Sequence, residues 1–146
     1  MIKPFDQQLF DANDKPAREV VKATFAGYYG IVCNDNPDTY GPDLAGHRGS
    51  VFESWIEVEV RHSWKGHQFP FDKVHFPMRK AKFFSYKPII FVILNSEMTH
   101  LLWFRGEDLQ CGGVERKKNT RLTTDESFIE VPLSFGTKIR SFLYCS

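Results

Sequence analysis

The feature that most constrains the fold is an uninterrupted apolar run, Ile89-Ile90-Phe91-Val92-Ile93-Leu94, bounded by Pro88 and Asn95. A strand with apolar side chains on both faces must be covered on both faces, so this run predicts the central strand of a sheet that has a layer on each side. Residues 101–104 (LLWF) are expected to form its partner strand, and residues 128–133 (FIEVPL) a late edge strand.

The covering layers are predicted on either side of this run in the chain. Asp14 is a favoured N-cap for a helix that starts near Lys15, with Pro16 tolerated in the first turn and Gly27 or Gly30 near its end. A second helix is expected to start at Pro77 and to carry residues 78–84. Together these elements predict an α/β fold, a mixed sheet flanked by helices, in one domain over residues 1–146.

Composition excludes several classes of protein. No run approaches the ~18 apolar residues that a membrane-spanning helix needs, so no membrane partner is expected. The first fifteen residues lack the apolar segment of an export signal. The three cysteines form no CxxC pair, which argues against a disulfide framework and a structural zinc site and favours a reducing cytoplasm. With a net charge of +1, nucleic-acid binding would depend on local basic clusters.

A second predicted strand, residues 54–61 (SWIEVEVR), alternates apolar and polar side chains. Its apolar side chains are expected on one face and its charged side chains, Glu57, Glu59 and Arg61, on the other. A polar face of this kind is most often simply the solvated side of an antiparallel sheet.

An acidic residue upstream gives this polar face a second interpretation. Asp43 precedes Glu57 by fourteen residues, a separation at which a hairpin brings the two carboxylates side by side. Two adjacent carboxylates repel each other without a cation, and their oxygens suit Mg²⁺. A metal-bound water beside a phosphate would support phosphodiester hydrolysis. Asp38, nineteen residues before Glu57, is an alternative to Asp43, but Pro42 would break a strand that starts there.

These residues resemble the PD-(D/E)xK nuclease superfamily, in which an Asp opens one strand and a (D/E)xK motif lies along the next. Pro42-Asp43 corresponds to the first motif and Glu57-Val58-Glu59 to the second, and the resemblance extends over about residues 15–95. The superfamily includes type II restriction enzymes, Holliday-junction resolvases and small phage endonucleases. The resemblance implies a restriction-endonuclease-like core and a Mg²⁺ cofactor, with Mn²⁺ as a substitute. The implied ligands are Asp43, Glu57, the carbonyl of Val58 and, from the first helix, Glu19.

The motif departs from the family pattern at one position, where Glu59 replaces the lysine. Glu59 would then act as a metal-linked base, or a cation from elsewhere would take the place of the lysine. Arg61, Arg79 and Lys80 are the candidates for that cation, and we assign catalytic roles to Glu59 and Lys80 beside Asp43 and Glu57. Glu19 has a structural alternative, since an acidic residue in the first turn of a helix favours the helix dipole.

Two basic clusters are candidates for contacts with nucleic acid. Arg79 and Lys82 lie in the first turns of the second predicted helix, whose free N–H groups also attract phosphate. The second cluster, Arg116, Lys117 and Lys118, lies in a predicted loop, and both clusters have the alternative of a solvated charged surface. His75, between Val74 and Phe76, is expected to be a packed core residue.

The sequence therefore predicts a Mg²⁺-dependent endodeoxyribonuclease that acts on duplex or branched DNA in the cytoplasm of a bacterium or phage-infected cell. Because one 17.0 kDa domain reaches one strand, cutting both strands would require a homodimer. Two alternatives remain open: a non-catalytic module with a degenerate nuclease fold that binds nucleic acid or protein, and a relative that cleaves RNA.

Overall fold

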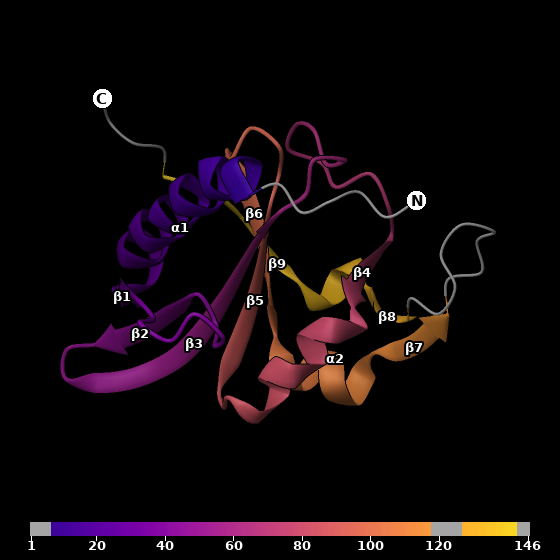
Figure 1. Ribbon diagram of the computed structural model, residues 1–146. Coiled ribbons are helices and arrows are strands. Elements are labelled where there is room, and N and C mark those ends of the chain that lie inside the picture. The colour runs from indigo at the N-terminus through magenta and orange to yellow at the C-terminus, as the bar shows by residue number, and fades with distance from the viewer. Residues whose placement is uncertain (1–6, 118–126, 143–146) are drawn as a thin grey trace.

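The computed structural model describes residues 7–117 and 127–142 (Figure 1). Its elements are α1 (Gln7–Tyr29), β1 (Val32–Asp35), β2 (Leu44–Arg48), β3 (Val51–Val60), β4 (Lys73–Pro77), the 3₁₀ helix η1 (Met78–Ser85), β5 (Ile89–Leu94), β6 (His100–Arg105), α2 (Gly106–Gly112), β7 (Val114–Lys117), β8 (Ser127–Pro132), the 3₁₀ helix η2 (Leu133–Phe135) and β9 (Thr137–Arg140).

The described strands form two sheets. The first has six strands in the order β1-β2-β3-β5-β6-β9, and the second has three in the order β4-β8-β7. All pairings are antiparallel except that between β3 and β5, which is parallel. The predicted mixed sheet with flanking helices is therefore confirmed, and the apolar run of β5 is its central strand, between β3 and β6.

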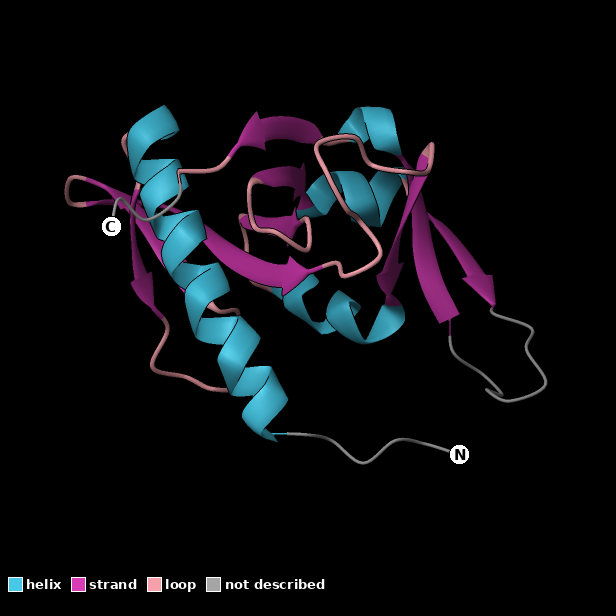
Figure 2. Ribbon diagram, turned by 90° about the horizontal axis from the view of Figure 1, so that it is seen from above, coloured by secondary structure: helices cyan, strands magenta, loops and turns pink. Residues whose placement is uncertain are grey.

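The two faces of the six-stranded sheet bury separate apolar cores. On one face α1 packs its buried residues, including Val21 and Phe25, against Ile56 and Val58 of β3. On the other face Phe91 and Ile93 of β5 pack against residues of β4, η1, α2 and β8. Figure 2 shows α1 lying along one side of the sheet and the second sheet on the other side. The alternation of β3 is thus confirmed, and Glu57 lies on the face opposite to α1.

Helix α1 differs from its prediction at its start. It begins at Gln7, so Asp14 and Pro16 lie inside it rather than at its N-terminus. A proline inside a helix removes one backbone hydrogen bond and costs about 3 kcal/mol. The burial of Ala17, Val20 and Val21 offsets that cost. The end is as predicted: Gly30 adopts a φ of +66° and donates its N–H to the carbonyl of Ala26, as in an αL cap.

The other corrections concern the region that forms the second sheet. The expected second helix is a 3₁₀ helix, η1, that follows β4 directly. Strand β8 is the central strand of the second sheet, so the prediction of an edge strand was wrong. His75 lies on β4 with half of its side chain exposed, so it is not a core residue. In the part of the chain that the structure describes, no helix is long and apolar enough to cross a membrane.

Candidate functional site

The hairpin of β2 and β3 brings Asp43 and Glu57 together. Leu44 pairs with Ile56, which leaves Asp43 opposite Glu57 at the start of β2. The main-chain N–H of Asp43 donates to Oε1 of Glu57 at 3.3 Å. The main-chain N–H of Val58 donates to Oδ2 of Asp43 at 2.8 Å. Main-chain N–H groups of the hairpin therefore hold both carboxylates in place, side by side as the fourteen-residue separation predicted.

Glu57 is a buried acid, with 7% of its surface exposed. Burial raises the pKa of its carboxyl to about 7, and the adjacent negative charge of Asp43 raises it as well. The ammonium group of Lys80 opposes both effects, because it contacts Oε2 of Glu57 directly. One positive charge thus faces two carboxylates, and it offsets their repulsion only in part.

Lys80 reaches this position because η1 follows β4 directly and packs its buried Phe83 into the core. The same short helix carries Arg79 and Lys82, whose side chains are exposed. These three cations and the acid pair line a hollow of about 210 Å³. Its lining residues are Asp14, Thr39, Tyr40, Gly41, Asp43, Glu57, Val58, Arg79, Lys80, Lys82 and Phe83.

A tightly bonded loop before β2 forms another part of the hollow. The side-chain amide of Asn36 donates to the carbonyl of Pro42 at 2.9 Å, and the N–H of Asp38 donates to Oδ1 of Asn36 at 3.1 Å. The carboxylate of Asp38 accepts the N–H of Tyr40 at 3.0 Å. The carboxylate of Asp38 is therefore engaged in a hydrogen bond within the loop. Asp38 does not line the hollow, whereas Asp43 does.

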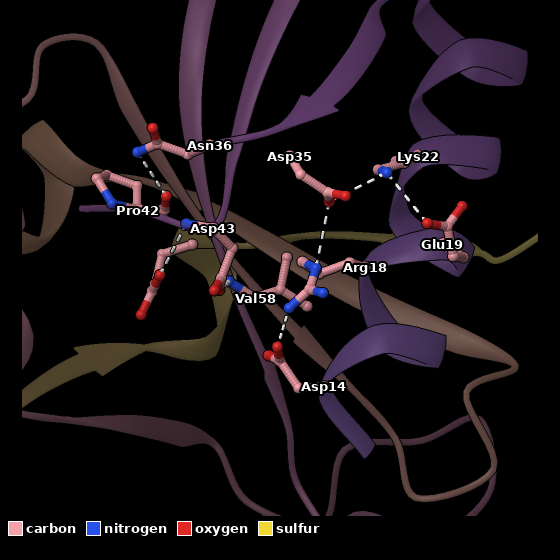
Figure 3. A network of polar contacts seen from close by, with 10 residues as sticks. Asp14, Arg18, Glu19, Lys22, Asp35, Asn36, Pro42, Asp43 and Val58 are labelled. Atoms are coloured by element: carbon pink, nitrogen blue, oxygen red, sulfur yellow. Dashed lines mark hydrogen bonds and ion pairs between the residues drawn. The ribbon is translucent and has the colours of Figure 1, made fainter. Parts of the chain in front are cut away.

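Helix α1 contributes Asp14 to the hollow, where sequence reasoning had expected Glu19. Glu19 accepts from Lys22 at 3.0 Å, and Lys22 also pairs with Asp35 at 3.1 Å. Arg18 bridges Asp35 and Asp14, so these residues form one chain of ion pairs along the helix (Figure 3). The structure therefore does not bring Glu19 to the acid pair. Asp14 was not predicted as a residue of this site, because its expected role was that of a helix cap.

Three further predicted residues that the structure describes lie outside the hollow. Glu59 pairs with Nε of Arg61 at 3.2 Å, two residues further along β3. Arg116 lies on β7 and pairs with Glu130 of β8 at 3.4 Å. Lys117 ends β7, and Lys118 falls outside the described residues.

The acid pair, Asp43 and Glu57, offers few side-chain ligands for a metal ion. Among residues 7–117 and 127–142, no group of three His, Cys, Asp or Glu side chains is arranged to hold a metal ion. Mg²⁺ does not require such a group, since it is commonly held by one or two carboxylates together with waters and substrate phosphates. Two oxygen donors with excess negative charge, beside cations that suit a phosphate, match that mode of binding.

No family model matches the chain. No curated protein sequence matches it either. Two solved structures are similar to it in part. The Holliday junction resolvase Hjc from Archaeoglobus fulgidus shares 13% identity and a TM-score of 0.41, over 90% of each chain. The nuclease D212 from a fusselovirus shares 12% identity and a TM-score of 0.46, over 93% of this chain and 89% of that one. Both TM-scores are below 0.5, so neither similarity assigns a function to this chain.

Proposed function

We propose that this protein is a metal-dependent endonuclease that hydrolyses phosphodiester bonds in DNA. The observation that carries the proposal is the pair of Asp43 and the buried Glu57 in a hollow that three cations also line. The acids suit a divalent cation, and the cations suit the phosphate on which it would act. The sequence pattern Pro42-Asp43 with Glu57-Val58-Glu59 supports the same assignment through its resemblance to PD-(D/E)xK nucleases.

Asp43 and Glu57 would hold Mg²⁺, or Mn²⁺ in its place, together with the carbonyl of Val58. When bound, the ion would lower the pKa of a water ligand and neutralise negative charge on the phosphate. The N–H of Val58 orients the Asp43 carboxylate through its hydrogen bond. Asp14 is the acid of α1 that lines the hollow, and we propose it, in place of Glu19, as the residue that orients a water of the hydrated ion.

Lys80 would take the place of the motif lysine, from η1 instead of β3. Its contact with Oε2 of Glu57 favours the ionised carboxylate, the form that a metal requires. Arg79 and Lys82 would hold the phosphate of the DNA strand. Glu59 would have no catalytic role, because it does not line the hollow and its carboxylate pairs with Arg61 instead.

One observation favours a second candidate function. Lys80 already neutralises part of the charge on Glu57, and an ion pair in the place of a metal is what a non-catalytic relative would retain. In that case the hollow would bind a phosphate of DNA or RNA through Arg79 and Lys82 without cleaving it.

Cleavage of supercoiled plasmid and of a four-way junction in Mg²⁺, and then in Mn²⁺, distinguishes the two candidates. We expect cleavage by the wild type and a loss of roughly 10²–10³-fold in rate for Glu57→Gln and for Asp43→Asn, because each removes a charge that stabilises the transition state through the metal. Glu130→Gln, which changes an acid outside the hollow, is the matched control and should cleave at the wild-type rate. Equal rates for wild type and Glu57→Gln, or binding without cleavage, would exclude the proposed catalysis. Cutting of both strands would further require two copies of the chain.

A further inference from the structure

We propose that Tyr40 stacks on an unpaired nucleobase beside the hollow, so that the preferred substrate is DNA with an unpaired strand, such as a fork, a branch or a single-stranded segment. This inference rests on the proposed function, and it adds a preference for DNA structure that the acid pair alone does not give.

The first observation is the exposure of Tyr40 in a hollow that is lined mainly by polar and charged residues. Its surface is 85% exposed, the highest value among the large hydrophobic side chains that the structure describes. Most of the aromatic rings that line the two cores are buried. Tyr40 lines the same hollow as Glu57 and Arg79, so an apolar ring is presented to solvent where a phosphate and its nucleotide would bind.

The second observation is that the backbone under this ring is fixed. The N–H of Tyr40 donates to Oδ1 of Asp38 at 3.0 Å, and the N–H of Gly41 donates to the carbonyl of Asp38 at 3.1 Å. A Cβ added at Gly41 would lie 2.6 Å from Nδ2 of Asn36, so the loop also packs too closely for a side chain there. A ring on a fixed backbone loses less conformational entropy on binding than one on a flexible loop.

A ring presented in this way selects DNA that has an unpaired base. Inside a duplex both faces of each base are covered by neighbouring bases, whereas an unpaired base offers a free face. Stacking of an aromatic ring on a base contributes binding whatever the base, and a cationic groove beside it follows the backbone. Arg79 and Lys82 supply that positive charge in the same hollow, and both side chains are exposed.

The test measures binding in EDTA, which separates it from cleavage. A forked DNA and a blunt duplex of equal length, each with a fluorescent label, are titrated with protein at one fixed salt concentration. We expect the wild type to bind the fork roughly tenfold more tightly than the duplex, which lies within the range for one stacked base. Tyr40→Ala should lose this preference, and Tyr40→Phe, which keeps the ring, should retain it. Phe71→Ala is the control, since Phe71 is 60% exposed and does not line the hollow.

Every outcome of this experiment decides the inference. Equal binding of fork and duplex by the wild type, an undiminished preference in Tyr40→Ala, loss of the preference in Phe71→Ala, or no binding of either DNA would overturn it. An unchanged circular dichroism spectrum of Tyr40→Ala, together with retention of the fork preference by Tyr40→Phe, would show that the preference was lost with the ring and not with the fold. A preference for forks that depends on Tyr40, in a protein that fails to cleave any DNA, would support the stacking role and reject only the proposed catalysis.

Discussion

Two glutamates in this molecule are both paired with cations, and their pKa values move in opposite directions. Glu57 on β3 is buried beside Asp43 and contacts one cation, Lys80, and its pKa rises to about 7. Glu130 on β8 is half-buried, and Lys73 approaches it at 3.2 Å, His75 at 3.0 Å and Arg116 at 3.4 Å. Its pKa falls below the usual value, mainly through the hydrogen bond from Lys73.

The comparison shows that burial and a neighbouring like charge, more than the presence of an ion pair, set the state of a carboxylate. At Glu57 burial is the largest effect, and one lysine does not overcome it. At Glu130 three basic side chains converge, and the hydrogen bonds from Lys73 and His75 favour its ionised form. A site with unneutralised negative charge is one that a metal ion would stabilise, whereas Glu130 already has its counter-ions.

The largest effect is expected in the pH dependence of stability without metal. The folded-state pKa of Glu57 lies above the ordinary value of 4.5, so the folded state binds the proton more tightly than the unfolded state. The contribution of Glu57 to stability is therefore complete below about pH 4.5 and is lost as the pH rises to about 7, by an amount on the order of 3 kcal/mol. Urea unfolding in EDTA across this range should give a falling free energy of unfolding for wild type and a flatter profile for Glu57→Gln.

In the same experiment, the contribution of Glu130 to stability is expected to change with pH in the opposite direction, which Glu130→Gln would reveal. Because the pKa of Glu130 is lowered, its stabilisation is present above the ordinary value and disappears as the pH falls through the lowered one. The substitution should therefore lower the free energy of unfolding above the ordinary pKa and change the slope of the profile only at acidic pH. A profile of Glu57→Gln that runs parallel to that of wild type between pH 4.5 and 7 would contradict the raised pKa.

The next effect is expected from removing one cation from each acid. Lys80→Met keeps most of the side-chain volume but leaves Glu57 beside Asp43 with no ammonium group in contact. At pH 8 we expect a loss of about 2 kcal/mol in the free energy of unfolding, less than for a fully buried pair because the Lys80 side chain is 19% exposed.

Lys73→Met is the matched variant at Glu130, where His75 and Arg116 remain in place. Its urea midpoint should stay within experimental error of wild type, since ion pairs at a surface contribute little. Equal losses of stability in Lys80→Met and Lys73→Met would mean that the burial of Glu57 does not make its ion pair contribute more than that of Glu130.

The acid pair was predictable from the sequence because its geometry depends on local rules. Alternation along residues 54–61 fixes which side chains share a face, and a short hairpin fixes what lies opposite Glu57. Lys80 was predictable only as one cation among several, since its contact with Glu57 spans 23 residues and depends on where η1 begins.

The second sheet was not predictable, because its pairings are far apart in the chain. His75 pairs with Glu130, 55 residues later, and neither β4 nor β8 has a pattern that identifies its partner. The alternative for Glu19, an acid in the first turn of a helix, depended on a helix that begins near Lys15. With α1 beginning at Gln7, Asp14 is the acid of this helix that lines the hollow, and Glu19 instead pairs with Lys22.

A smaller effect is expected when Mg²⁺ is added. A ligand that binds only the folded state at ten times its dissociation constant stabilises that state by about 1.4 kcal/mol. Thermal unfolding should therefore shift upward by a few degrees in wild type. The shift should vanish in Glu57→Gln and Asp43→Asn and persist in Glu130→Gln, because Glu130 already has three cationic partners. A shift that survives in Asp43→Asn would locate the binding of Mg²⁺ elsewhere.

The smallest effect concerns the two basic clusters and their contacts with DNA. Arg79 is exposed and lines the hollow, whereas the guanidinium of Arg116 lies 3.4 Å from Glu130. A cation that already has a counter-ion gains less from a phosphate, so Arg79→Ala should weaken DNA binding roughly fivefold and reduce the slope of log affinity against log salt by about one. Arg116→Ala should change both quantities by less. In Glu130→Gln the difference between the two arginines should narrow, because Arg116 then loses its acidic partner. An Arg116→Ala variant that loses as much affinity as Arg79→Ala would show that the surface of the second sheet, with its paired charges, contacts DNA as closely as the hollow does.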